Sequence, residues 1–369
     1  MFGVKSKFRE LKEIVLQLPG THLKDKVVVF ESDDWGSQRI PDKTVYNYCL
    51  KNGYPMNQNI YTQYDCLESV EDVSRLKDVL NSYSSKPMFT LNMILANPDY
   101  LKIKESNFEQ YFYKPIDKSI SYSSVLTEIK EGIDKGVFSA QFHGREHINV
   151  NRWLTALQKK DVDVHFAFDL GMAGIFPKDN VRIGNDMVVA LENWDHIDLL
   201  DKQAIVKNGL ELFEQIFGIK SKSAISCNYV WNDQIEEVYY DRGVELIQSS
   251  RFQLLPKGNY EGFNKKYKYT GLRNTRGQIY SVRNVLFEPT YNQDKDWVGS
   301  AMKQIERSFK LKKPAIISSH RLNYCSGLSE LNRDQSLLKL NRLIAQIQKK
   351  WSDVHFCTSD ELYKKYLKH

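Results

Sequence analysis

Short runs of β-branched and aromatic residues alternate with stretches of helical periodicity over most of this chain. The runs lie at residues 26–30, 88–94, 137–142, 164–168, 223–227, 245–248, 278–282, 314–318 and 354–357. Between them, apolar residues recur at helical spacing, as at Val70, Val73, Leu76 and Leu80. Strands that alternate with helices usually pair in parallel, because each crossover returns the chain to the same end of the sheet. The pattern predicts an α/β fold whose parallel sheet is either open or closed into a barrel.

The chain is predicted to form one domain. Its 369 residues suffice for one barrel-sized domain or two ordinary ones. We find no internal repeat, no low-complexity tract and no Pro/Gly/Ser-rich linker that would divide it. The longest insertions, at about 39–68 and 251–277, both follow predicted strands, where loops usually shape the substrate site of a barrel. Residues 1–369 are therefore expected to be a single domain with two long strand-end loops.

The N-terminal segment has the pattern of a basic amphipathic helix, with Val4, Phe8, Leu11 and Val15 on one stripe. We expect this stripe to pack against the domain, and binding to an anionic membrane surface is the alternative. The sequence contains neither the run of about eighteen apolar residues of a membrane span nor the apolar segment of a signal peptide. These features predict a cytoplasmic protein that does not span a membrane.

Composition argues against several classes of function. Five cysteines are widely spread and never spaced as CxxC, which favours reduced thiols over a disulfide framework or a zinc ribbon. Among them, Cys227 is expected to be a small buried residue. The net charge of +6 is modest for this length and the lysines are scattered, so a nucleic-acid partner is not expected. No Gly-x-Gly-x-x-Gly follows the first run, which removes the main support for a dinucleotide-binding fold.

Polar residues collect where the predicted strands end. They are Asp33, Asp34, Asn92, His143, Asn228, Arg283, Asn284 and His320. In a parallel barrel the C-terminal strand ends form a single rim, so residues far apart in the chain can converge on one pocket. Each residue alone has a structural explanation, such as capping of the next helix, but together they favour a functional site.

Two acids and two histidines of this set, together with His147, have the chemistry of metal-assisted hydrolysis. His143 and His147 lie four residues apart, and a carboxylate from a separate strand can complete a three-ligand site with an open position. A metal ion at such a site lowers the pKa of water, and Asp33 can then take the proton. His320 is placed to act as the general acid for a leaving group. We expect a divalent ion, with zinc favoured over cobalt, manganese or nickel.

Three segments resemble the motifs of the polysaccharide deacetylase superfamily, carbohydrate esterase family four. Residues 31–36, Glu-Ser-Asp-Asp-Trp-Gly, are similar to its Thr-Phe-Asp-Asp strand end. Residues 143–147 have the spacing of its His-x-x-x-His motif, and residues 316–321 are similar to its last motif, a histidine after an apolar strand. The resemblance runs in motif order from about residue 26 to residue 320 and implies a distorted parallel (β/α) barrel of seven or eight strands.

The resemblance also implies roles for five residues. Asp33 corresponds to the catalytic base, and Asp34, His143 and His147 correspond to the metal ligands. His320 corresponds to the general acid. These roles imply a metal-dependent carbohydrate deacetylase that removes an acetyl group, N-acetyl before O-acetyl, from a sugar or polysaccharide in a surface-polysaccharide pathway.

The third motif of the family is not matched. It normally carries an arginine that orients the base and offers a backbone N–H to the oxyanion, whereas residues 226–231 read Ser-Cys-Asn-Tyr-Val-Trp. Asn228 cannot supply the arginine's charge, and the backbone of Tyr229 is the transferable part. Arg145, Arg283 and Arg321 are the candidates for the missing charge, and the sequence does not choose among them. Substrate and oxyanion contacts are predicted at Tyr229, Asn228, Trp35 and Arg283, with Trp35 stacking on a sugar ring.

Two other functions remain open. Residues 143–147 also spell His-x-x-Glu-His, the inverted zinc-protease signature, in which Glu146 would be the base. That mechanism needs the whole pentapeptide inside a helix, whereas Gly144 follows a strand-like run. The second alternative is a glycan-binding barrel without catalysis, which the missing third-motif arginine favours.

Overall fold

The computed structural model describes residues 11–182 and 184–368, and within this range nine strands form one sheet. The strand order is β10-β7-β6-β5-β2-β1-β12-β11, and β13 also pairs with β1. The bounds are β1 Lys26–Trp35, β2 Phe89–Ile94, β5 Phe138–Gly144, β6 Ser223–Ile225, β7 Leu246–Ser249, β10 Ile279–Val282, β11 Val285–Leu286, β12 Ala315–His320 and β13 Val354–Phe356. These strands pair in parallel. The predicted parallel α/β sheet is therefore confirmed.

One segment joins the two ends of this sheet. β10 pairs with β7 and β11 pairs with β12, and Arg283 and Asn284 connect β10 to β11. The N–H of Arg283 donates to the Ser249 carbonyl at 3.0 Å, whereas the N–H of Asn284 donates to the Ile316 carbonyl at 3.1 Å. The Asn284 side chain also accepts from the Ile316 N–H at 2.9 Å. Between these two adjacent residues the chain thus passes from pairing with β7 to pairing with β12. The sheet curls into the distorted (β/α) barrel that the resemblance implied.

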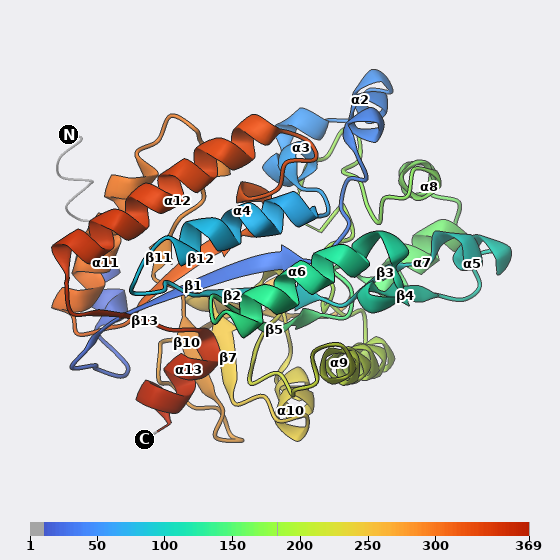
Figure 1. Cartoon of the computed structure of the whole chain (residues 1–369). Coiled ribbons are helices and arrows are strands. Elements are labelled where there is room, and N and C mark those ends of the chain that lie inside the picture. The colour runs from blue at the N-terminus through green and yellow to red at the C-terminus, as the bar shows by residue number, and fades with distance from the viewer. Residues whose placement is uncertain (1–10, 183, 369) are drawn as a thin grey trace, which may run out of the picture.

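Helices cover the outside of the barrel (Figure 1). Their bounds are α2 Lys43–Lys51, α3 Ile60–Tyr64, α4 Val70–Asn81, α5 Tyr100–Glu105, α6 Ser123–Asp134, α7 Val150–Gln158, α8 Val162–Asp169, α9 His196–Phe217, α10 Asp233–Asp241, α11 Trp297–Lys310, α12 Glu330–Lys350 and α13 Ser359–Leu362. α4 packs against α6 and α12, α12 packs against α11, and α9 packs against β5 and α10. The apolar faces of these helices and the outer face of the sheet form the largest hydrophobic core.

The inner face of the barrel changes from apolar to polar along β1. Val27 and Val29 belong to an apolar cluster near the strand starts. Because side chains alternate along a strand, the next residues on this face are Glu31 and Asp33. Buried carboxylates need polar partners, so the upper part of the barrel must contain a hydrogen-bonded network.

Three insertions, two of them after strand ends, contribute to the cavity described below. Segment 39–68 carries α2 and α3, and segment 170–195 connects α8 to α9. Segment 250–270 contains an antiparallel hairpin of β8 (Phe252–Pro256) and β9 (Phe263–Tyr267). The hairpin stands where a regular barrel would have a crossover helix between β7 and β10. A second small pair, β3 (Ala96–Pro98) with β4 (Tyr113–Pro115), follows β2.

The predicted strand at residues 164–168 is wrong, because this segment is helical and belongs to α8. Asp161 caps the helix by accepting hydrogen bonds from the backbone N–H groups of Asp163 and Val164. The apolar residues Val164, Ala167 and Phe168 are buried at helical spacing. An apolar run this short fits either a strand or a buried helix, and here the cap decides.

The N-terminal helix is described from residue 11 and extends to residue 17, so Val4 and Phe8 lie outside the described residues. Leu11 and Val15 are 57% and 53% exposed, so the described part of the stripe does not pack as predicted. The segment is attached instead by a hydrogen bond from the Tyr267 hydroxyl to the backbone of residue 16, at 2.6 Å. Within residues 11–182 and 184–368, no helix combines the length and apolarity that crossing a membrane requires.

Candidate metal and catalytic site

Neighbouring residues of a strand normally point to opposite faces, yet Asp33 and Asp34 both line the same cavity. An irregularity in β1 makes this possible, since the pairing of β1 with β2 shifts in register here and Asp34 has a φ of 75°. Such a left-handed conformation costs roughly 1–3 kcal/mol in a residue other than glycine. Gly36 follows with a φ of +86°, and a Cβ at this position would lie 2.3 Å from the Ile94 carbonyl oxygen. Glycine is therefore required beside the acids.

Asp34 lies between two imidazoles. Its Oδ1 is 3.1 Å from Nε2 of His143 and 3.4 Å from Nε2 of His147. The three side chains are buried, with exposed fractions of 6%, 3% and 9% respectively. The ligand atoms of a tetrahedral zinc ion, each about 2.0–2.1 Å from the metal, lie about 3.3 Å apart. The spacing around Asp34 Oδ1 therefore fits a divalent metal.

The protonation of Asp34 and His147 also fits a metal. Nδ1 of His143 donates to the Ile225 carbonyl at 3.0 Å, which leaves Nε2 as the atom that faces Asp34. Burial lowers the pKa of His147 to about 4, so this ring is neutral at neutral pH, as a metal ligand must be. Burial alone would raise the pKa of Asp34, but the imidazoles of His147 and His143 hold it well below its usual range. Asp34 is therefore ionised.

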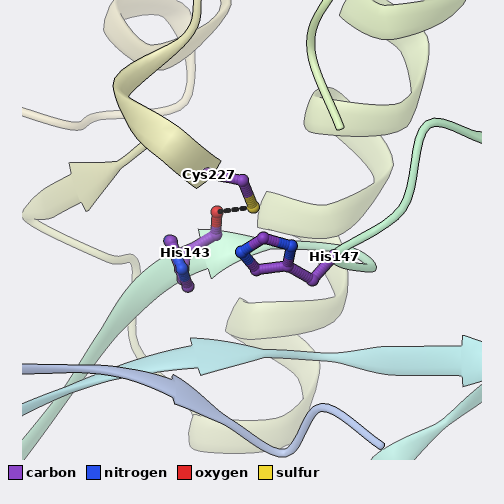
Figure 2. A group of neighbouring side chains, drawn as sticks. All are labelled: His143, His147 and Cys227. Carbon is purple, nitrogen blue, oxygen red and sulfur yellow. Dashed lines mark hydrogen bonds between the residues drawn. The ribbon is translucent and has the colours of Figure 1, made fainter. Parts of the chain in front are cut away.

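A thiol lies beside the two histidines, as Figure 2 shows. Single ligand atoms of His143, His147 and Cys227 lie within 4.8 Å of one another, and Cys227 Sγ donates to the His143 carbonyl at 3.7 Å. Burial, together with the nearby Asp34, raises the pKa of the thiol well above its usual value. Cys227 is an alternative third donor, but Asp34 is ionised and contacts both imidazoles, at 3.1 and 3.4 Å. As predicted, Cys227 is small and buried.

Asp33 is fixed by a bidentate ion pair with Arg283. Both oxygen–nitrogen distances are 2.6 Å, and Nδ2 of Asn92 donates to Oδ1 of Asp33 at 2.8 Å. Burial alone would raise the pKa of Asp33, but the guanidinium lowers it to about 2. Arg283 also donates to Glu31 at 2.7 Å and so compensates a second buried acid. Of the three candidate arginines, Arg283 is the one that contacts the predicted base.

The other two arginines have structural partners. Arg145 donates to both carboxylate oxygens of Glu146, at 2.6 and 2.7 Å. Arg321 pairs with Asp65 at 2.7 Å and with Glu68 at 2.8 Å. The contact with Arg145 also bears on the protease alternative, because Glu146 is buried and paired, and the segment from the end of β5 to residue 147 is not helical. The geometry that an inverted zinc protease requires is absent here.

His320 lies opposite Asp33 in the register between β12 and β1. Its Nδ1 donates to a carboxylate oxygen of Glu288 at 2.6 Å, so Nε2 faces the cavity, 3.7 Å from Oδ2 of Asp33. The Tyr61 hydroxyl lies 3.3 Å from the same Nε2. Burial alone would lower the pKa of His320, but Glu288 raises it to about 9. The ring therefore holds a proton at neutral pH, as a general acid must.

Tyr229 and Asn228 line the cavity, but not in the predicted way. The N–H of Tyr229 donates to the Ser226 carbonyl at 3.0 Å, so it is not free to bind an oxyanion. Its hydroxyl accepts a hydrogen bond from Nη1 of Arg283 at 3.1 Å. The φ values of Asn228 and Tyr229, 57° and 59°, form the sharp turn that aims the tyrosine ring at the site.

One predicted substrate contact is wrong. Trp35 is 0% exposed and its Nε1 donates to the Ser32 hydroxyl, because the irregular end of β1 turns the indole into the core outside the barrel. It cannot stack on a sugar. The guanidinium of Arg283 is bound to Asp33 and Glu31, and its contact with a substrate stays a prediction.

Sequence reasoning missed Glu288 and Tyr61. Glu288 lies two residues after β11 and is fully buried. The same rule that found the other strand-end residues could have found it. Tyr61 lies on α3, within an insertion that we predicted to shape the substrate site. No local signal distinguishes it from other tyrosines, and only the tertiary structure brings it to His320.

All the predicted catalytic and ligand residues line one cavity of about 500 Å³. They are Asp33, Asp34, His143, His147 and His320. The structure therefore brings together two strand-end acids from β1, a histidine pair from β5 and the following loop, and a histidine from β12. This arrangement can hold a divalent ion, remove a proton and supply a proton within one buried space.

No protein-family model and no curated protein matches the chain. Among solved structures, the chain is similar to a proposed glycoside hydrolase/deacetylase from Parabacteroides distasonis, with a TM-score of 0.51 and 8% identity, over 94% of this chain and 73% of that one. Lower TM-scores, 0.43 and 0.38, relate it to a proposed polysaccharide deacetylase from Mycobacterium smegmatis and a family four pseudoenzyme from Bacillus anthracis. Each is 11% identical; the matches cover 94% and 92% of this chain and 94% and 66% of the others. The first similarity confirms the barrel fold, and fold alone does not assign a reaction.

Proposed function

We propose that the chain is a metal-dependent hydrolase that removes an acetyl group, N-acetyl in the first place, from a sugar or glycan. One observation carries the proposal: Oδ1 of Asp34 lies 3.1 and 3.4 Å from the Nε2 atoms of His143 and His147, in the cavity that also holds Asp33 and His320. A ligand set, an ionised acid and a protonated imidazole together meet the needs of hydrolysis of an acyl bond.

Asp34, His143 and His147 are the proposed ligands, and zinc is the expected ion. When bound, such an ion supplies Lewis acidity for a carbonyl oxygen and lowers the pKa of water. The hydrogen bond from His143 to the Ile225 carbonyl fixes the tautomer and the plane of that ring. The ion pair between Asp33 and Arg283 keeps the second acid turned away from the ligand set and toward His320.

In the proposed reaction Asp33 accepts a proton from the attacking water, and the acetyl carbon forms a bond to the water oxygen. His320 donates its Nε2 proton to the departing amine as the carbon–nitrogen bond breaks, and Glu288 stabilises the imidazolium until then. The Tyr229 hydroxyl, which accepts from Arg283, retains its own proton to donate to the developing oxyanion. The products are acetate and a free amino sugar.

The alternative of a barrel without catalysis rested on the missing third-motif arginine. Arg283 makes the contact to the base that such an arginine would make, from a different strand. The second alternative, an inverted zinc protease, lacks its helix and its free glutamate. Neither alternative is supported by a specific observation.

The test combines metal analysis with acetate release from N- and O-acetylated sugars. Asp33→Asn is expected to retain one equivalent of metal and lose about 10²–10⁴-fold in turnover, since it removes the base and not a ligand. Asp169→Asn is the matched control, because this exposed acid on α8 pairs with Lys104 outside the cavity and should change neither quantity. The proposal would be refuted if the purified protein contained no metal, if a chelator did not change its stability, and if it released no acetate.

A further inference from the structure

The cavity is lined by two chemically different sets of residues. Beside the charged groups, which include Arg39 and Asp186, the lining contains an apolar wall of aliphatic and phenylalanine side chains from the insertions and from the turn after β6. These residues are Phe176, Val188, Val189, Val230, Leu254 and Phe263. Their side chains offer no hydrogen bonds. The hydroxyl groups of a second sugar placed here would lose water without gaining partners, which is costly.

The acids and histidines of the proposed site are largely buried. Asp33, Asp34 and His143 are each 4% exposed, so a reacting group must enter the cavity to reach them. A cavity of about 500 Å³ has the size that encloses one drug-sized molecule. A sugar in the middle of a long glycan continues in two directions, whereas a sugar at a chain end or in a small glycoside continues in one. The burial favours the second kind of substrate.

The apolar wall is a fixed part of the fold. β8 is tied to the turn after β6 by the pairing of Val230 with Leu254 and by the hydrogen bond from the Trp231 N–H to the Leu254 carbonyl, at 3.2 Å. The fully buried Gln253 donates to the Trp231 carbonyl at 2.9 Å. Leu254 and Phe263 are only partly buried and line the cavity. An apolar ligand would cover them and gain about 25 cal/mol per Å² of apolar surface removed from water.

We infer that the substrate is a terminal or single acylated sugar that carries an apolar group, and that this group lies against Leu254, Phe263 and Val188. The inference rests on the proposed function, because it places the acyl group at the proposed metal and catalytic residues. The apolar group is either the aglycone or an acyl chain longer than acetyl. Both would use the same wall.

The experiment compares three glycosides of 2-acylamino-2-deoxyglucose: methyl N-acetyl, hexyl N-acetyl and methyl N-hexanoyl. Binding is measured by calorimetry on zinc-loaded Asp33→Asn, and acyl release is measured on the wild type, with an acetylated polymer for comparison. At least one of the longer compounds should bind about tenfold or more tightly than the methyl N-acetyl compound, since each buried methylene contributes about fourfold. The compound that binds more tightly shows whether the apolar group is the aglycone or the acyl chain.

Phe263→Ser should remove most of this preference, and Val188→Thr should weaken it even if the first variant folds poorly. Phe252→Ser is the matched control, because Phe252 lies on the same hairpin, is 39% exposed and does not line the cavity. Equal binding of all three compounds, or faster release from the polymer, would overturn the inference while leaving the hydrolase intact. If the protein bound a longer compound more tightly but released no acyl group, the proposed hydrolase activity would be refuted and the apolar binding site would be supported.

Discussion

The two sides of the cavity contain histidines in opposite states. His147, on the ligand side, and His320, on the acid side, are both largely buried, with exposed fractions of 9% and 17%. Burial lowers the pKa of His147 to about 4, whereas Glu288, acting against burial, raises that of His320 to about 9. Behind His147, Nδ1 has no partner among the described residues. Of these two rings, burial leaves His147 neutral, whereas the acid behind His320 keeps that ring protonated.

Removal of the neutral ring should have the largest effect. His147→Ala takes away a proposed ligand, so we expect the metal content to fall from about one equivalent to almost none and acetate release to fall by about 10³-fold or more. Metal analysis and initial rates measure the two. His165→Ala on α8 is the control, because that ring donates to the Leu157 carbonyl and should leave both unchanged. Full metal content in His147→Ala would contradict the division of roles.

Removal of the protonated ring should affect turnover alone. His320→Asn is expected to lower kcat by about 10²-fold while the metal content stays near one equivalent, because a general acid and not a ligand is lost. Pairing metal analysis with steady-state kinetics separates this result from that of His147→Ala. If His320→Asn also lost the metal, the two sides of the cavity would not be chemically distinct.

The raised pKa of His320 should also appear in stability. Its folded pKa of about 9 exceeds the ordinary value of 6.5, so the stabilisation is complete below pH 6.5 and is lost as the pH rises through 9. In metal-free protein we expect the free energy of unfolding to fall by about 3 kcal/mol between pH 6.5 and 9.5. Denaturant titrations at several pH values measure it. The fall should be much smaller in Glu288→Gln, and an equal fall in both proteins would count against the pair.

Replacement of Glu288 should have the smallest effect on the rate, but it tests the comparison of the two histidines most directly. Glu288→Gln keeps the shape of the side chain but removes the charge that faces His320, leaving Asp33, Asp34 and the Tyr61 hydroxyl around the ring. The pKa of His320 should fall, and the alkaline limb of the rate profile should move down by about two pH units. We expect kcat at neutral pH to fall by about tenfold. If the alkaline limb of the rate profile did not move, it would report the titration of a group other than His320.

Much of the fold could be predicted because alternation of apolar runs and helical stretches is a local property. The runs at residues 26–30, 88–94 and 314–318 became β1, β2 and β12 with small changes of bounds. Segment 164–168 failed because a buried helix and a buried strand have the same short apolar run. The joining of β7 to β12 through residues 279–286 has no sequence signal, since it depends on partners that are distant in the chain.

The site could be predicted as far as it lies at strand ends. Asp33, Asp34, His143 and His320 converge on one cavity as expected. The prediction that Trp35 stacks on a sugar ring was wrong because the bulge in β1 changes the face of the sheet on which this side chain lies. The partner of the base could not be chosen because three arginines satisfied the same rule, and burial and distance separate them only in three dimensions.

The strand exchange at residues 279–286 has a consequence for biosynthesis. Arg283 lies where the chain passes from pairing with β7 to pairing with β12, so its guanidinium reaches Asp33 only when both β7 and β12 are in place. β12 is among the last strands to leave the ribosome. Until it docks, Asp33 and Glu31 lack their shared cation, so the proposed base is not positioned before the ring of strands is complete.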